Sequence, residues 1–236
     1  MNAVHASRHA VTIVLAAGLG RRLGGPKARL AWPCDADLGG DSPAAEPLAW
    51  AHARARLHCE SARVLVVTRA ELADALSAWP VPAGAELVVS TEPDDVGPAG
   101  SIAAAARRLQ DDHALSATSL RAIVTPVDCP PVRGEVVAAL LAALEPAQAR
   151  TSPVAARPRH EGQRGHPIAM TGELFTAYLG ADRPSLRDVL RAHAPRVCDV
   201  EVSDPGVLAD LDTLEDYARL TGTREPPRFL GAFRAA

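Results

Sequence analysis

Short apolar runs alternate along the chain with longer stretches rich in alanine and leucine. The apolar runs predict β-strands at about 11–16, 63–68, 86–90, 121–127, 151–156, 166–170 and 197–202. The intervening stretches predict helices at about 46–59, 70–78, 99–110, 132–144, 171–179, 184–193 and 213–221. This alternation is typical of an α/β fold in which crossover helices flank a mostly parallel central sheet. The chain has 236 residues, and we expect a single domain over residues 1–222.

Three segments depart from the regular alternation. Residues 1–9 are expected to be a flexible N-terminus, and residues 32–47, rich in Gly, Asp, Pro and Ser, predict a mobile loop. Residues 223–236 contain paired prolines and predict a C-terminal tail. Arg8 and His9 before an apolar stretch also suit a short signal peptide, but the arginines that follow that stretch favour a first strand.

Composition narrows the classes of partner. A formal net charge of −3 and few aromatic residues argue against nucleic-acid binding. No segment is long and apolar enough to predict a membrane span. The cysteines are scattered at 34, 59, 129 and 198, which argues against a zinc knuckle, a redox pair or a disulfide framework. A reducing cytoplasm is the expected location.

A glycine-rich loop directly follows the first predicted strand. Ala16, Ala17 and Gly18 keep the strand end small, so a ligand can approach the backbone there, and Gly20 follows. The loop then carries positive charge on Arg21, Arg22 and Lys27. Oriented N–H groups beside cationic side chains suit a triphosphate. A tight βα turn with solvated basic residues is the simpler alternative.

Two familiar phosphate motifs do not fit this loop. A Walker A loop needs Gly-Lys-Ser/Thr, whereas Lys27 lies between Pro26 and Ala28. The dinucleotide fingerprint needs a third glycine, where this chain has Leu23. A different kind of nucleotide site is therefore indicated.

Asp128 is the strongest candidate for catalysis outside the first loop. It follows an apolar strand, so we expect it at the carboxyl edge of the sheet, where open α/β sheets bind ligands. A carboxylate there can hold magnesium, the ion that neutralises the phosphates of an NTP. Helix capping is the alternative role for this aspartate.

Five segments together resemble a known family. Residues 15–27 have the pattern Leu-Ala-Ala-Gly-x-Gly-x-Arg-Leu-Gly-x-x-Lys, which resembles the signature of nucleotidyltransferases that move a nucleoside monophosphate to a phosphorylated acceptor. The other segments are Gly-Pro-Ala-Gly-Ser-Ile at 97–102, Thr-Pro-Val-Asp-Cys-Pro at 125–130, Arg-Gly-His-Pro-Ile at 164–168 and Leu-Asp-Thr-Leu-Glu-Asp-Tyr at 211–217. Their order and spacing resemble the MobA-like NTP transferase family, with molybdenum cofactor cytidylyltransferases as the closest likeness, over about residues 11–220.

The resemblance implies a Rossmann-like nucleotidyltransferase fold and a set of site residues. The implied nucleotide-binding residues are Leu15, Ala16, Ala17, Gly18, Gly20, Arg22, Lys27, Gly100, Ser101 and Asp128. Of these, Arg22, Lys27 and Asp128 are implied to be catalytic, and Asp128 and Asp212 to hold Mg²⁺. Gly165, His166 and Pro167 are implied to line the acceptor pocket.

Simpler roles stay open for several of these residues. Asp212 and Thr213 are good helix N-caps, Ser101 suits an ordinary helix start, and a lone histidine such as His166 is often structural. Arg159, His160 and Arg164 either supply charge for an acceptor phosphate or belong to a solvated loop.

The substrates follow from finer features of the motifs. Ala16-Ala17 resembles the cytidylyl-type sequence and favours CTP over GTP. The resemblance also implies a phosphorylated acceptor such as molybdopterin, and a molybdoenzyme or a maturation protein as partner. Thr125-Pro-Val before Asp128, and Leu214 in place of the commoner proline, depart from the family pattern. A sugar-1-phosphate or phospholactate nucleotidyltransferase and a non-catalytic NTP-binding chaperone stay open as alternatives.

Overall fold

A computed structural model of the chain describes residues 10–33, 45–59, 61–93, 96–111, 120–145 and 152–231. The predicted flexible N-terminus, most of the predicted loop at 32–47 and the last five residues of the predicted tail lie outside this part of the chain. No helix in the described part is long and apolar enough to cross a membrane.

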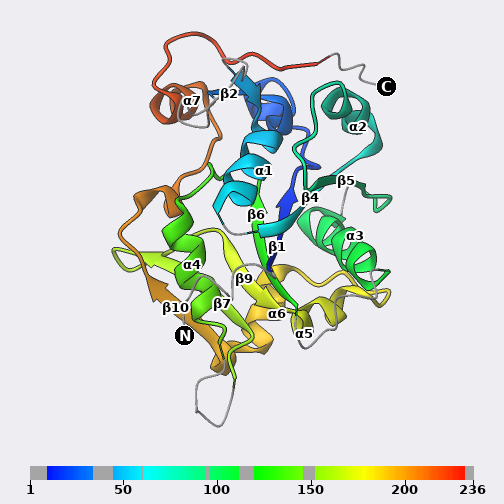
Figure 1. Cartoon of the computed structure of the whole chain (residues 1–236), viewed down its shortest axis with the longest axis vertical. Helices are drawn as coiled ribbons and strands as arrows, with labels where there is room; N and C mark the ends of the chain where they lie inside the picture. The colour runs from blue at the N-terminus through cyan, green and yellow to red at the C-terminus, as the bar shows by residue number, and fades with distance from the viewer. Residues whose placement is uncertain are drawn as a thin grey trace.

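An eight-stranded, mostly parallel sheet forms the centre of the molecule (Figure 1). Its main path runs in the order β10-β7-β9-β6-β1-β4-β5, and β8 pairs with β7. The strands are β1 (Ala10–Leu15), β4 (Ser61–Thr68), β5 (Ala85–Val89), β6 (Arg121–Pro126), β7 (Ala155–His160), β8 (Gln163–Arg164), β9 (Ile168–Thr171) and β10 (Val197–Glu201). β9 runs antiparallel to both β6 and β7. The single α/β domain predicted from the hydrophobic pattern is confirmed.

Helices cover both faces of this sheet. They are α1 (Leu48–Cys59), α2 (Ala70–Ser77), α3 (Pro98–Gln110), α4 (Gly134–Ala142), α5 (Gly172–Phe175), α6 (Leu186–Ala192) and α7 (Leu214–Thr221). In β1, Val11 and Ile13 pack on the side of α3, α5 and α6, whereas Val14 packs with α1 on the opposite side. Successive side chains of a strand point to opposite faces, so a central strand buried on both faces is apolar throughout.

Four parallel strands end at one edge of the sheet and deliver the chain segments that form the site. β1, β4, β5 and β6 are parallel neighbours, so the residues after their last positions meet at this edge. The antiparallel β9 begins at the same edge, because Ile168 pairs with Val124 of β6. Residues just before β9 therefore lie beside residues just after β6.

Several predicted boundaries differ from the structure. The strand expected at 151–156 is β7 at Ala155–His160, so Arg159 and His160 belong to a strand whose hairpin partner is β8. The helix expected at 171–179 is the short α5 followed by a 3₁₀ turn at Thr176–Tyr178. Inside the predicted loop 32–47, β2 (Ala31–Pro33) and β3 (Ala45–Pro47) form a separate antiparallel pair.

Candidate active site

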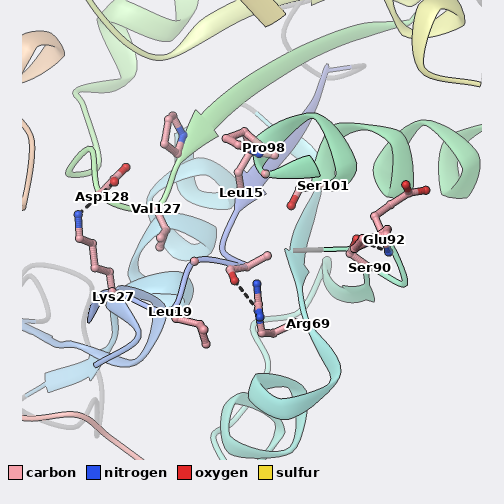
Figure 2. A pocket seen from close by; sticks show the side chains of 16 residues that line it. Leu15, Leu19, Lys27, Arg69, Ser90, Glu92, Pro98, Ser101, Val127 and Asp128 are labelled. Atoms are coloured by element: carbon pink, nitrogen blue, oxygen red, sulfur yellow. Dashed lines mark hydrogen bonds and ion pairs between the residues drawn. The ribbon is translucent and has the colours of Figure 1, made fainter. Parts of the chain in front are cut away.

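A cavity of about 720 Å³ lies at the carboxyl edge of the four parallel strands (Figure 2). Seven of the residues expected to bind nucleotide line it: Leu15, Ala17, Gly18, Gly20, Lys27, Ser101 and Asp128. They come from the loop after β1, the start of α3 and the end of β6. In Figure 2, Lys27 and Asp128 lie at one end of the cavity, and Ser90 and Glu92 lie at the other.

The loop after β1 is closed on itself by glycines. Gly20 has φ 59°, and a Cβ atom there would lie 1.9 Å from the carbonyl oxygen of Gly25. The backbone N–H of Gly25 donates to the Gly20 carbonyl at 3.2 Å. Only glycine fits this close approach, which brings the loop back toward the sheet and presents Lys27 next to the strand ends.

Lys27 connects two carboxylates from distant parts of the chain. Its Nζ donates to Asp128 Oδ2 at 3.2 Å and to Asp212 Oδ1 at 2.6 Å. The Lys27 side chain is 11% exposed, whereas Asp128 and Asp212 are 37% and 45% exposed. The ammonium group is thus fixed at the base of the site, and each carboxylate keeps a face open to solvent.

The charge on Lys27 is stabilised by these partners. Burial lowers the pKa of the ammonium group, but hydrogen bonds and charge interactions with Asp212 and Asp128 outweigh it, and the pKa is raised overall. Lys27 therefore stays protonated at neutral pH. It is also the only lysine in the sequence, since the other 24 basic residues counted with it are arginines.

Asp212 faces Lys27 because a neighbouring residue caps the following helix. Thr213 is the N-cap of α7 and accepts a hydrogen bond from the backbone N–H of Asp216 at 3.1 Å. The Asp216 carboxylate accepts in return from the backbone N–H groups of Thr213 and Asp212. The capping box leaves the side chain of Asp212 to the site, so the two roles weighed for this segment fall to adjacent residues.

The two carboxylates suit a hard divalent cation that arrives with a nucleotide. Their oxygen atoms converge on a single cation, the Lys27 ammonium, and oxygen ligands are those that Mg²⁺ and Mn²⁺ prefer. The described residues contain no cluster of three or more metal-ligating side chains. Two protein ligands are typical of a metal that completes its coordination with substrate phosphates and water.

Buried groups behind Asp128 hold the segment that carries it. His52 of α1 is fully buried, and its Nε2 lies 3.3 Å from the carbonyl oxygen of Val127. Burial lowers its pKa to about 4, so the ring is neutral at physiological pH. On the other side, the Asp128 carbonyl accepts from the N–H of Leu211 at 2.9 Å. This bond brings the loop of Asp212 against the end of β6.

Three polar or charged residues of the cavity were missed by the sequence interpretation. Arg69 follows β4, and Ser90 and Glu92 follow β5, all at the carboxyl edge. Arg69 Nε donates to the Ala17 carbonyl at 2.6 Å and so fixes the first loop (Figure 2). Their positions directly after predicted parallel strands were the signal that would have found them.

Glu92 is held by two arginines at the far end of the cavity. Its carboxylate accepts from Arg107 at 2.6 Å and from Arg183 at 2.8 and 3.0 Å. These hydrogen bonds lower the pKa of Glu92 to about 2, with the bonds from Arg183 as the largest cause. The pair with Arg183 ties the strand end after β5 to the segment before α6.

His166 lies in a second, smaller cavity of about 320 Å³. Leu15, Pro98 and Pro126 line both cavities, so the two adjoin there. Burial lowers the pKa of His166, and its Nδ1 is buried without a hydrogen-bond partner among the described residues. Gly165 is required beside it, because a Cβ atom there would lie 2.0 Å from the Val207 carbonyl oxygen.

Other predicted residues lie behind or beside the cavities. Ala16 is fully buried, with its N–H bonded to the Val67 carbonyl, and Gly100 packs against Glu92. The Arg22 side chain is 85% exposed, with Nη1 3.9 Å from Asp212 Oδ2. Gly165 and Pro167 are absent from the linings of both cavities.

The basic residues around the β7–β8 hairpin pair with acidic residues of β10. Arg164 donates to Asp199 at 3.0 Å, and Arg159 lies 3.4 Å from Glu201. His160 Nδ1 is 2.9 Å from the Val202 carbonyl oxygen. They are absent from the linings of the two cavities, and the expectation that they add charge for an acceptor phosphate finds no support in this arrangement.

Comparisons with known proteins agree with this architecture. A family model described as the MobA-like NTP transferase domain matches residues 12–197. None of the curated proteins compared with the chain matches it.

Solved structures share the fold at low sequence identity. A Mycobacterium sp. strain JC1 homologue of Mycobacterium tuberculosis Rv0371c is 22% identical, with 91% of this chain and 96% of that chain covered and a TM-score of 0.65. Rv0371c from M. tuberculosis in complex with manganese is 18% identical, with 91% and 99% covered and a TM-score of 0.60. The 4-diphosphocytidyl-2C-methyl-D-erythritol synthase of Anaerococcus prevotii is 13% identical, with 94% and 98% covered and a TM-score of 0.61.

Proposed function

The chain belongs to the MobA-like NTP transferase family, and from this premise we propose that it transfers a nucleoside monophosphate from an NTP to a phosphorylated small molecule and releases pyrophosphate. The observation that carries this proposal is the position of Lys27. Its ammonium group is held between Asp128 and Asp212 at one end of a cavity that a glycine-rich loop helps to form. A fixed cation beside two carboxylates and a glycine-rich loop suits a metal-bound triphosphate.

The NTP occupies the larger cavity in this proposal. Its phosphates lie near Gly18, Gly20 and Lys27, and its nucleoside extends toward Ser90 and Ser101. The acceptor enters through the smaller cavity beside His166, so that its phosphate reaches the α-phosphorus where the cavities adjoin. The cavities meet at the end of β6, two residues before Asp128.

The reaction depends on positioning and charge neutralisation. An acceptor phosphate oxygen attacks the α-phosphorus in line, and the bond to the β-phosphate oxygen breaks. The attacking phosphate is ionised at neutral pH, so no general base is required. Lys27 and Arg22 stabilise the charge that develops on the transferring and leaving phosphates, because their positive charges lie beside the phosphate oxygens.

Asp128 and Asp212 would hold a divalent metal ion, for which we propose Mg²⁺. The ion supplies charge neutralisation to the phosphates. Rv0371c, a protein with the same fold, has been solved in complex with manganese, which supports the proposal of a divalent cation. When the phosphates bind, the Lys27 ammonium moves from the carboxylates onto phosphate oxygens, which leaves Asp128 and Asp212 available as ligands.

We favour CTP as the nucleotide and a molybdopterin-type phosphate as the acceptor. The support is Ala16-Ala17, which resembles the cytidylyl-type sequence, together with Gly165-His166-Pro167. A molybdoenzyme or a maturation protein is then the expected protein partner. A 4-diphosphocytidyl-2C-methyl-D-erythritol synthase with the same fold is also compatible with a cytidine nucleotide. The acceptor is therefore to be identified among molybdopterin, sugar phosphates and other phosphorylated molecules.

A pyrophosphate-release screen tests the proposal. Each of the four NTPs is incubated with Mg²⁺ and either molybdopterin, a panel of sugar phosphates or phospholactate. We expect acceptor-dependent pyrophosphate release, fastest with CTP and abolished in Asp128→Asn. NTP binding without turnover on any acceptor would favour a nucleotide-binding chaperone instead.

A further inference from the structure

The segment after α7 lies across the loop that carries Lys27. The chain after α7 runs past β2 toward α2, as the red segment in Figure 1 shows, and we name its residues 228–231 the C-terminal strap. The family model matches residues 12–197, so the strap lies beyond the matched region. Nothing in the family match assigns it a role.

The strap binds the chain on both sides of Lys27. Before it, the ring of Phe229 covers Gly25, where a Cβ atom would lie 2.9 Å from the ring. After it, the N–H of Leu230 donates to the Arg29 carbonyl, and the N–H of Ala31 donates to the Arg228 carbonyl, both at 2.8 Å. The short 3₁₀ turn at Lys27–Arg29 is therefore held between these contacts.

A buried arginine ties the same turn to the strap. Arg29 is 5% exposed, and its Nε donates to the Leu230 carbonyl at 2.8 Å while Nη2 donates to the Gly231 carbonyl. Hydrogen bonds from a charged donor are worth more than neutral ones, and a buried arginine deprived of its acceptors carries a large desolvation cost. The carbonyl groups of the strap thus accept hydrogen bonds from a buried cation that lies two residues from Lys27.

The same C-terminal region also supplies Asp212. Between Asp212 and the strap, the Tyr217 hydroxyl of α7 donates to the Ala31 carbonyl at 2.6 Å. One continuous segment therefore brings a carboxylate to the Lys27 ammonium and clamps the turn from which Lys27 extends.

We propose that the C-terminal strap is a positioning element of the nucleotide site, which holds the Lys27 turn in the geometry that meets Asp128, Asp212 and the triphosphate. Phe229 and the backbone carbonyls of residues 228, 230 and 231 act through Gly25, Ala31 and Arg29, without touching the substrate. The inference rests on the proposed function for its nucleotide, but the placement of Lys27 can be measured without one.

Amine labelling measures that placement directly, because Lys27 is the only lysine. Folded protein is treated with acetic anhydride at pH 8, and acetylation of Lys27 is quantified by mass spectrometry against the N-terminal amine. We expect Phe229→Ala to raise the labelling rate of Lys27 at least fivefold and to weaken binding of Mg-CTP about fivefold to thirtyfold by titration calorimetry. Phe229→Leu should return both the labelling rate of Lys27 and the affinity for Mg-CTP most of the way to the wild-type values, since leucine refills the space over Gly25.

Two controls separate positioning from general loss of stability. Val137→Ala in α4 removes buried methyl groups far from the strap, and deletion of residues 232–236 leaves every strap contact described above in place. Both should label and bind as the wild type does. Wild-type labelling of Lys27 in Phe229→Ala, or an equal rise in Val137→Ala, would overturn the proposal. A wild-type protein that binds no NTP would refute the proposed function alone, because the labelling result still decides the role of the strap.

Discussion

Replacement of Lys27 by methionine should have opposite effects on metal binding and on turnover. Before nucleotide binds, the Lys27 ammonium occupies the point on which Asp128 and Asp212 converge, at 3.2 and 2.6 Å. A divalent ion and the ammonium group therefore compete for the same oxygen atoms. Methionine keeps most of the length and the apolar character of the side-chain stem but removes the competing charge.

The size of both effects follows from the geometry. Two unit charges 4 Å apart attract by about 1 kcal/mol in water and about 4 kcal/mol at an effective dielectric constant of 20. Both carboxylates are more than a third exposed, so solvent screening favours the lower limit, or about 1–2 kcal/mol for the two pairs together. Metal affinity without nucleotide should thus rise about fivefold to thirtyfold. Loss of a preorganised cation from the transition state should lower kcat by about 10²–10³.

Two assays measure these opposite changes. Titration of Mn²⁺ followed by electron paramagnetic resonance gives the metal affinity of the nucleotide-free protein, and pyrophosphate release at saturating NTP gives kcat. Lys27→Arg, which keeps the charge, is the matched control for metal affinity. An unchanged or weaker metal affinity in Lys27→Met would refute the competition between ammonium and metal. A raised KM with unchanged kcat would mean that Lys27 binds the ground state only.

The two carboxylates, the choice of nucleotide base, the pH dependence of stability and Gly165 can each be tested separately. Asp128→Asn and Asp212→Asn should each abolish most turnover while circular dichroism shows an intact fold, and near-normal turnover in both would remove the metal assignment. Titration calorimetry should find CTP bound more tightly than GTP, and equal affinities would mean that Ala16-Ala17 does not select the base. The pKa of His52 is about 4 in the folded protein, below its ordinary value of 6.5. Between pH 6.5 and pH 4 the unfolded state therefore binds more protons than the folded state, and the free energy of unfolding falls by up to about 3 kcal/mol as the pH drops through this range. Urea denaturation across that range should show this loss, and His52→Gln should flatten it. Gly165→Ala should lower the Tm by several degrees because the new Cβ meets the Val207 carbonyl, and an unchanged Tm would show that the segment can shift.

The fold was predictable because its central strands are buried on both faces. β1, β4 and β6 appear in the sequence as mainly apolar, β-branched runs, and the structure has them within one or two residues of the predicted positions. β7 was misplaced because its sequence contains Arg157, Pro158 and Arg159, which hide the strand pattern. The ion pair between Arg157 and Asp199 of β10 compensates the charge of Arg157 within the strand. The two residues are 42 positions apart, so local periodicity cannot predict that they pair.

The site was predictable only where its residues belong to local motifs. The first loop and Asp128 follow strands directly, so their meeting at one edge of the sheet follows from parallel topology. The bridge that Lys27 makes to Asp212 spans 185 residues, and the bond of Arg183 to Glu92 spans 91. Such contacts depend on how loops return to the sheet edge, which hydrophobic patterning does not determine.

The fate of labelled phosphates distinguishes nucleotidyl transfer from phosphoryl transfer and from NTP hydrolysis. The wild-type protein is incubated with Mg²⁺, the acceptor that gives pyrophosphate release, and CTP labelled at either the α- or the γ-phosphorus. We expect the α-label to appear in the acceptor product and the γ-label to appear in pyrophosphate, and we expect neither in Asp128→Asn. Transfer of the γ-label to the acceptor, or its release as inorganic phosphate, would contradict nucleotidyl transfer.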